Sequence, residues 1–151
     1  MKRFYLIVTL TCLGLFVGLN SFYPEENASL VQDVLSQTNQ FRKSKGLPEL
    51  IIRNDLNEIA QKHSSDMARG RVGFGHGGFE KRNAMASQKI IPMKNFGENV
   101  AFGASTGKEV VTMWKNSSGH RKNMLGRFRF IGIGIAKDKQ GQIYYTQVFA
   151  G

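Results

Sequence analysis

The sequence predicts an α+β fold in which helices pack on an antiparallel sheet. Three amphipathic segments with helical spacing precede a last stretch that has the two-residue period of strands. Because the predicted helices come first along the chain and the predicted strands come last, this arrangement is favoured over alternating βαβ units. The chain of 151 residues is long enough for one domain with a sizeable core, and no repeat or linker divides it.

Apolar spacing defines the first helices along the chain. Residues 28–45 carry apolar side chains at helical spacing, and Gly46 ends the pattern. Asn54 is the expected N-cap of a second amphipathic helix, which stops at Gly70. A shorter helix is expected over residues 79–87, followed by an irregular or extended segment.

A capping box marks the next helix. Thr106 and Glu109 stand three residues apart, so each side chain can bond the backbone of the other, and an apolar helical segment follows them. One or two further helical turns are expected over residues 120–125. These elements complete the helical part of the predicted fold.

The last stretch predicts a hairpin. Isoleucines alternate with Gly132 and Gly134 over residues 131–135, and a polar turn over residues 137–141 leads into a second strand over 142–149. Because glycine has no side chain, one face of the first strand is left open to the close approach of a helix or a ligand.

The N-terminal end has the layout of an export signal. Lys2 and Arg3 precede an apolar run over residues 4–19. We therefore expect a signal peptide over residues 1–21, and an uncleaved N-terminal anchor is the alternative because the cleavage-site pattern is poor. We expect a protein that is secreted or resides in the periplasm or cell envelope.

The residues after the signal indicate a single exported domain without disulfides. Residues 22–28 form a short leader, and the domain is expected over residues 29–151. The only cysteine, Cys12, lies within the apolar run and is lost on processing. Stability must then come from the core, which fits a bacterial exported protein better than a small animal secreted one.

The charge is strongly positive and bears on the class of partner. The chain has 21 Lys and Arg against 11 Asp and Glu, a formal net charge of +10, and loss of Lys2 and Arg3 lowers it to +8. Outside the cytoplasm this field favours anionic lipid headgroups, wall polymers or acidic glycans. Cations without intervening acids form either a docking face or a solvated face: Lys115, Arg121, Lys122, Arg127, Arg129 and Lys137.

These charges lead to definite expectations about partners. We expect a monomer. We also expect no binding of nucleic acid. The Arg-Phe-Arg-Phe segment over residues 127–130 would suit a nucleic-acid platform in a cytosolic protein, but the N-terminal signal predicts export. Membrane contact is expected only through an uncleaved N-terminal segment or through the basic surface.

A glycine-rich segment over residues 73–78 satisfies the dinucleotide pattern G-x-G-x-x-G. That pattern binds a dinucleotide when a strand precedes it within a βαβ unit, whereas a helix precedes it here, so no nucleotide site is expected. His76 is the more informative residue of this segment. Neither helix formation nor core packing explains an imidazole among glycines.

Four ionisable residues are candidates for chemistry. His63 lies on the apolar stripe of the second helix and is expected to be a buried, satisfied histidine. Glu98 stands beside apolar residues, so its carboxylate needs partners, and His76 and His120 would supply them. Two imidazoles and one carboxylate are a ligand set for zinc or another divalent ion, and they could equally carry out acid–base catalysis. A helix N-cap or a surface position is an equal alternative for His120.

Five motifs occur in order and together closely resemble the CAP superfamily. They are Gly75-His76, Gly97-Glu98-Asn99-Val100-Ala101, Trp114-x-x-Ser117-x-Gly119-His120-Arg121-x-Asn123-Met124-Leu125, Ile131-Gly132-Ile133-Gly134 and Tyr145-Thr146-Gln147-Val148-Phe149. The family comprises SCP-like extracellular proteins and is named after cysteine-rich secretory proteins, antigen five and pathogenesis-related class one proteins. The likeness is to its bacterial branch and covers residues 29–151.

The resemblance implies a three-layer α-β-α sandwich, secretion, and a central cleft where two histidines and two glutamates meet. By motif position, His76 and His120 match the histidines and Glu98 matches the first glutamate. Ser117 stands where the second glutamate belongs, so the set is incomplete, while a two-histidine metal site is retained. Glu80, close to His76 in sequence, could substitute.

The resemblance leaves three hypotheses for function. In the first, a secreted module binds a lipid, a glycan or a cell-envelope component, and His76, Glu98 and His120 hold a divalent metal or organise the core. In the second, a metal- or His/Glu-dependent hydrolase uses one histidine as base, oriented by Glu98, for water attack on an ester or peptide bond. In the third, the cleft is inert and the cluster is a buried hydrogen-bond network. No organic cofactor is expected.

Overall fold

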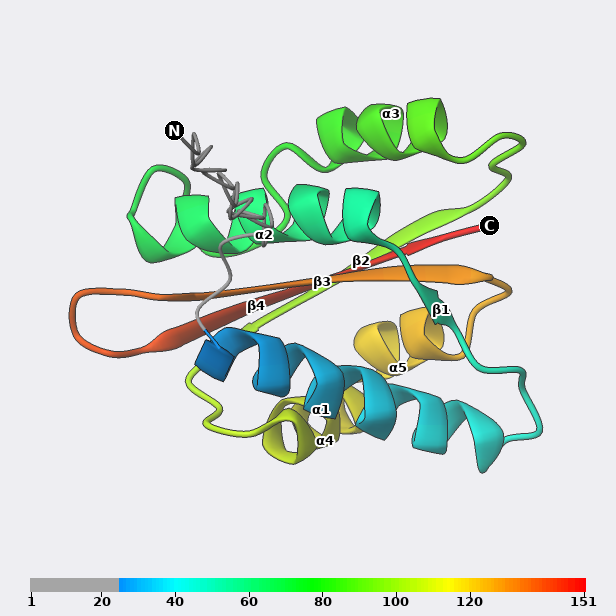
Figure 1. Ribbon diagram of the computed structural model, residues 1–151, viewed down its shortest axis with the longest axis horizontal. Coiled ribbons are helices and arrows are strands. Elements are labelled where there is room, and N and C mark those ends of the chain that lie inside the picture. The colour runs from blue at the N-terminus through cyan, green and yellow to red at the C-terminus, as the bar shows by residue number, and fades with distance from the viewer. Residues whose placement is uncertain (1–24) are drawn as a thin grey trace, which may run out of the picture.

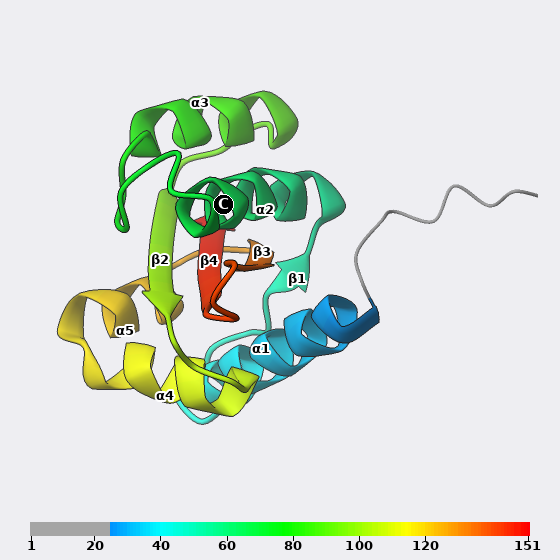
Figure 2. The same cartoon turned by 90° about the vertical axis from the view of Figure 1, so that its left-hand side faces the viewer.

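The computed structural model describes residues 25–151 as one sheet between two layers of helices. The sheet has the strand order β1-β3-β4-β2, with β1 at Ile51–Ile52, β2 at Phe96–Phe102, β3 at Phe130–Lys137 and β4 at Ile143–Ala150. One face carries α2 (Asn54–Ala68) and α3 (Phe79–Lys89), and the other carries α1 (Glu25–Lys43), α4 (Gly107–Asn116) and α5 (Ser118–Met124), as Figures 1 and 2 show. The expected three-layer α-β-α sandwich is confirmed.

The N-terminal predictions fall partly outside this description. The expected signal peptide over residues 1–21 and the first part of the leader over 22–28 lie outside the described residues. No helix within residues 25–151 is both long and apolar enough to span a lipid bilayer.

The sheet is mixed, which corrects the expectation of a purely antiparallel sheet. The predicted hairpin of β3 and β4 is confirmed, and β2 also pairs with β4 in antiparallel orientation. However, β1 pairs with β3 in parallel, with Ile51 opposite Phe130 and Ile52 opposite Ile131. A strand of two residues has no period that a sequence pattern could detect.

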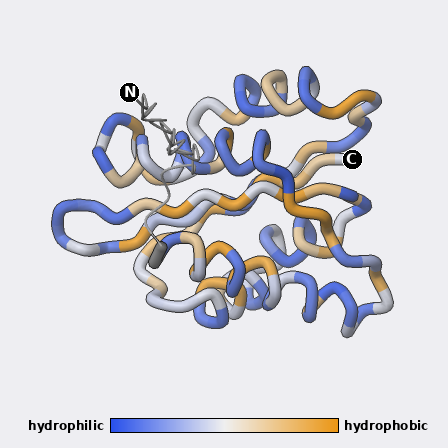
Figure 3. The backbone as a smooth tube through the Cα atoms, in the orientation of Figure 1, coloured by the Kyte–Doolittle hydropathy of each residue, from blue (hydrophilic) through white to orange (hydrophobic). Residues whose placement is uncertain are grey.

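Two glycines let α2 lie directly against β3. A Cβ atom added at Gly132 would stand 2.2 Å from the carbonyl carbon of Leu56, and one at Gly134 would stand 2.2 Å from that of Ala60. The close approach that these glycines predict is therefore confirmed, and its partner is a helix. Figure 3 shows hydrophobic residues along the central strands, where this packing forms the core.

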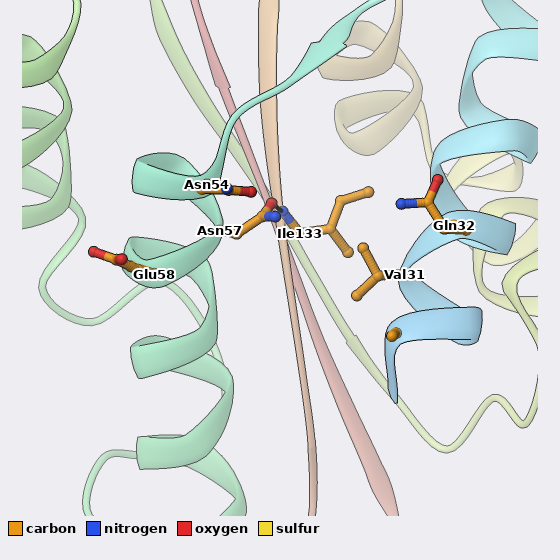
Figure 4. Close-up of a pocket in the computed structure, with 7 residues that line it drawn as sticks. Val31, Gln32, Asn54, Asn57, Glu58 and Ile133 are labelled. Carbon is orange, nitrogen blue, oxygen red and sulfur yellow. Dashed lines mark hydrogen bonds between the residues drawn. The ribbon is translucent and has the colours of Figure 1, made fainter. Parts of the chain in front are cut away.

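Beyond the end of β1, the edge of β3 has no neighbouring strand within the described residues, and side-chain amides of α2 form the hydrogen bonds there instead. Asn57 Oδ1 accepts a hydrogen bond from the Ile133 N–H at 2.9 Å, and Gln61 Oε1 accepts one from the Ile135 N–H at 2.9 Å. Asn57 and Gln61 are four residues apart, which is a rise of about 6 Å along a helix, and Ile133 and Ile135 are two residues apart, which is a rise of about 6.6 Å along a strand. The two side-chain amides of the helix therefore match the spacing of the two N–H groups on the strand edge. Figure 4 shows Asn57 beside Ile133, with Val31 of α1 on the other side.

The helix starts confirm one capping prediction and correct another. The box of Thr106 and Glu109 is present at the start of α4, with both reciprocal hydrogen bonds. Asn54 is the first residue of α2 and not its N-cap. Arg53 takes the N-cap position with an extended backbone and no capping side chain, and it pairs instead with Asp55.

Candidate functional site

The glycine-rich loop over residues 73–78 brings His76 to Glu98. This loop leads into α3, while Glu98 stands in β2 with a side chain that is 0% exposed. His76 Nδ1 lies 2.8 Å from Glu98 Oε1, and the His76 side chain is 49% exposed. Because a carboxylate accepts, Nδ1 carries a proton, and in the neutral tautomer of the ring Nε2 is therefore unprotonated.

Arg82 is the second partner of Glu98. Its Nε lies 2.5 Å from Oε2 and its Nη2 lies 2.8 Å from Oε1, so the guanidinium contacts both carboxylate oxygens. The prediction that His76 and His120 would both pair with Glu98 is confirmed for His76 and wrong for His120, whose place Arg82 takes. A buried acid requires a compensating charge, and the planar guanidinium supplies it in two-point geometry.

Three further contacts fix the loop that carries His76. Arg82 Nη1 donates to the Gly77 carbonyl at 2.8 Å, and Arg82 Nη2 lies 3.3 Å from the His76 carbonyl. His63 Nε2 lies 2.8 Å from the Gly75 carbonyl, to which it must donate. His63 is buried, which confirms the prediction of a satisfied core histidine. Side chains from α2, α3 and β2 therefore hold the loop in place.

His120 lies on α5 at an apolar pocket. Burial, and secondly the charge of His76, lower the pKa of His120, so its imidazole is neutral near pH 7. The pocket has a volume of about 320 Å³. Its lining consists of Phe74, Val100, Ala101, Phe102, Met113, Trp114, Ser117 and His120. Ser117, at the position of the missing glutamate, is thus part of the pocket wall.

Large apolar side chains surround this pocket and face solvent. Phe74 is 52% exposed, Phe102 42% and Met113 47%. Phe74 packs edge to face on Phe102 with ring centroids 4.8 Å apart, and Phe102 stacks on Tyr144 at 5.8 Å. Phe102 and Met113 also line an adjoining hollow of about 680 Å³. Contiguous exposed apolar side chains of this kind mark a ligand or partner site.

Buried amides connect the helical layer to the site. Gln147 Nε2 donates to Thr38 Oγ1 at 2.8 Å, and Asn99 Nδ2 donates to Gln147 Oε1 at 3.3 Å. Asn123 Nδ2 in turn lies 2.9 Å from Asn99 Oδ1 and 2.8 Å from the Glu98 carbonyl. This chain of hydrogen bonds fixes α5 relative to β2.

The residues present do not fit the expected three-ligand metal set. Both oxygens of Glu98 already accept hydrogen bonds, and the Arg82 guanidinium would repel a divalent ion beside them. Among the side chains that the structure describes, no group of three His, Cys, Asp or Glu residues could hold a metal ion. Glu80 lines a separate polar pocket on α3 and supplies no substitute. A site on His76 and His120, and catalysis by His76, Glu98 and His120, stay predictions.

Basic side chains follow one another along the chain from the end of α4 to the start of β3. Five of the expected cations are exposed and form no ion pair within the described part of the chain: Lys115, Arg121, Lys122, Arg127 and Arg129. Lys115 Nζ lies 5.3 Å from the ring centre of Phe41, and Arg121 donates to the Lys115 carbonyl at 2.6 Å. This surface keeps its positive charge uncompensated.

Acidification is expected to weaken the fold through His63. Burial lowers the pKa of His63 below its ordinary value of 6.5. The unfolded chain then binds more protons than the folded chain as the pH falls through 6.5, so the free energy of unfolding decreases with falling pH. Urea unfolding between about pH 7.5 and 5 measures this slope. His63→Asn should flatten it, and an unchanged slope would contradict the account.

The sequence comparisons identify a family. The sequence model of the cysteine-rich secretory protein family, CAP, matches residues 35–149. The protein YkwD of Bacillus subtilis is 36% identical over 131 residues, which are 85% of this chain and 49% of YkwD. The membrane protein YlbC of the same organism is 30% identical over 123 residues, or 78% of this chain and 33% of YlbC.

The solved structures agree with that assignment. An extracellular protein of Bacillus anthracis that contains an SCP domain has a TM-score of 0.69 at 29% identity, over 81% of this chain and 40% of that one. A cysteine-rich secretory protein of Staphylococcus aureus has the same fold, with a TM-score of 0.69, 24% identity, and coverage of 87% and 41%. The chain spans half or less of the length of these relatives. The match of sequence and fold over most of the described residues shows that the chain belongs to the CAP family, in its bacterial branch.

Proposed function

We propose that this CAP domain is a secreted or envelope-associated module that binds a lipid component of the cell envelope in the pocket beside His120. One observation carries the proposal, namely the group of exposed apolar side chains around an apolar pocket. Phe74, Phe102 and Met113 would each gain by leaving water, at about 25 cal/mol per Å² of apolar area covered. The export signal that the sequence predicts and the similarity to an extracellular SCP-domain protein support the location.

The pocket offers different chemistry to the two ends of such a ligand. Its apolar chain would lie over Phe102 and Met113, while Ser117 and the neutral imidazole of His120 provide hydrogen bonds for a polar group. The basic surface formed by Lys115, Arg121, Lys122, Arg127 and Arg129 would keep the module close to anionic envelope polymers.

Shortening one apolar side chain at the pocket is expected to weaken binding selectively. Met113→Ser should raise the Kd for the neutral fluorescent probe N-phenyl-1-naphthylamine about tenfold, which corresponds to about 1.4 kcal/mol. Ile91→Ser is the control, because the Ile91 side chain is also exposed to solvent and lies outside the His120 pocket. Fluorescence titration gives both constants. Equal weakening by the two variants, or no binding by the parent, would reject the lipid-binding proposal.

A hydrolase is the second candidate, favoured by the His76–Glu98 contact. A carboxylate that holds Nδ1–H leaves Nε2 of His76 positioned as a general base for a water molecule. Nε2 would take a proton from the water as its oxygen adds to an ester or peptide carbonyl, and would return that proton to the leaving alcohol or amine as the C–O or C–N bond breaks. Hydrolysis of p-nitrophenyl butyrate should then fall about 100-fold or more in His76→Ala with the fold intact. Turnover that survives this change would come from elsewhere.

A further inference from the structure

A second pocket adjoins the loop of His76 and is separate from the His120 pocket. It has a volume of about 330 Å³ and lies between α2 and α3. Gly77 and Gly78 of the loop form part of its wall, whereas Phe74 of the same loop lines the His120 pocket. The two pockets have no lining residue in common, so the loop is a wall of both.

The lining of this second pocket combines apolar surface with excess positive charge. The apolar groups are Ile59, Val72 and Met85, and the cations are Lys62, Lys81 and Arg82. Its single acid, Asp66, already pairs with Lys62 at 2.6 Å and with Arg71 at 3.5 Å. Lys81 has no ion pair among the residues that the structure describes. A complementary ligand therefore has an alkyl part and one negative charge.

The groups that hold the His76 loop also line this pocket. Arg82 contacts both oxygens of Glu98 and donates to the Gly77 carbonyl, and His63 donates to another carbonyl of the loop. An anion in the pocket would compete with Glu98 and with Gly77 for the guanidinium of Arg82. Any shift of Arg82 would change the position of the carboxylate that binds His76 Nδ1.

We infer that this pocket is a second ligand site, for a small amphipathic carboxylate, and that its occupancy is transmitted to His76 through Arg82. The pocket volume of about 330 Å³ equals that of about eleven water-sized groups of ~30 Å³ each, which suits a carboxylate with a short alkyl chain. The inference concerns a different pocket from the proposed lipid site and stands whether or not that site binds lipid.

Octanoate titration of the full chain tests the inference. The probe is observed through the Cε1–H signal of His76 in carbon–proton correlation spectra, and a saturable shift is expected with a Kd near or below about 1 mM. Lys81→Gln should raise this Kd about fivefold or more. Lys45→Gln, which removes another exposed lysine outside the pocket, should leave it unchanged. The neutral analogue 1-octanol should bind more weakly than octanoate.

Several results of the octanoate titration would contradict the inference. The site would be rejected by the absence of a saturable change up to about 10 mM octanoate, or by equal affinity in the parent and Lys81→Gln. A response that Met113→Ser abolishes while Lys81→Gln preserves it would place octanoate in the His120 pocket. Saturable shifts of the Ile59 methyl signals without any change at His76 would overturn the transmission through Arg82.

Discussion

Replacing Arg82 with leucine is expected to lower the free energy of unfolding by about 3–5 kcal/mol, since it leaves a buried carboxylate without its counter-charge. The Glu98 side chain is 0% exposed, and Arg82 contacts both of its oxygens. The same change removes the hydrogen bond that Arg82 donates to the Gly77 carbonyl. Urea unfolding of the parent and the variant measures the loss directly.

Two further variants separate the buried charge from simple loss of packing. Arg82→Lys keeps a positive charge without two-point geometry and should be destabilised less than Arg82→Leu. Adding Glu98→Gln to Arg82→Leu removes the unpaired charge, so the double variant should recover part of the lost stability. A double variant that is less stable than Arg82→Leu alone would show that Glu98 stabilises the fold without needing Arg82.

Gly134→Ala is expected to lower the melting temperature by about 10 °C or more, because the new methyl group has no space. Its Cβ would stand 2.2 Å from the Ala60 carbonyl carbon and from the Gln61 nitrogen, which are helix backbone atoms that cannot rotate away. The helix α2 would have to move off the sheet, exposing core surface on that face.

Gly119→Ala is the matched control for this change. Gly119 lies in α5, and a Cβ added there meets no atom within 4 Å. Alanine favours the helix over glycine by up to about 1 kcal/mol, so this variant should be at least as stable as the parent. Similar melting temperatures for Gly119→Ala and Gly134→Ala would contradict the close packing of α2 on β3.

The sequence predicts those elements whose signals are local. The hairpin of β3 and β4 has alternating isoleucines, and α4 has a complete capping box at Thr106 and Glu109. β2 lacks such a signal, because its residues from Gly97 to Ala101 are all buried and include Glu98 and Asn99. Polar residues in a fully buried strand depend on partners far along the chain, so neither period nor polarity identifies the strand.

The site shows the same division. His76 could be singled out because glycines on both sides leave an imidazole without a local role. Arg82 could not, since α3 is polar and only Arg82 and Ala86 are buried in it. In the sequence, an arginine on a polar helix looks the same whether it is buried or solvated. Only the packing of α3 near β2 shows that Arg82 lies beside Glu98. The pairing depends on tertiary structure alone.

Arg82 also affects the chemistry left at a site that has one of the two glutamates typical of the family. Ser117 supplies no second carboxylate, and the one carboxylate present has its charge balanced by a guanidinium. We therefore expect Glu98 to hold His76 in position, and in the proposed hydrolase Nε2 of His76 would take up the proton.

The most direct test of this account is the protonation pattern of the imidazole rings in nitrogen–proton correlation spectra at about pH 8, above the ordinary histidine pKa. His76 is expected as the Nδ1–H tautomer, since Nδ1 donates to Glu98, and His63 as the Nε2–H tautomer, since Nε2 donates to the Gly75 carbonyl. Opposite tautomers in the two rings would confirm that Arg82 and Glu98 present His76 with an unprotonated Nε2. A His76 ring protonated on Nε2 would contradict it.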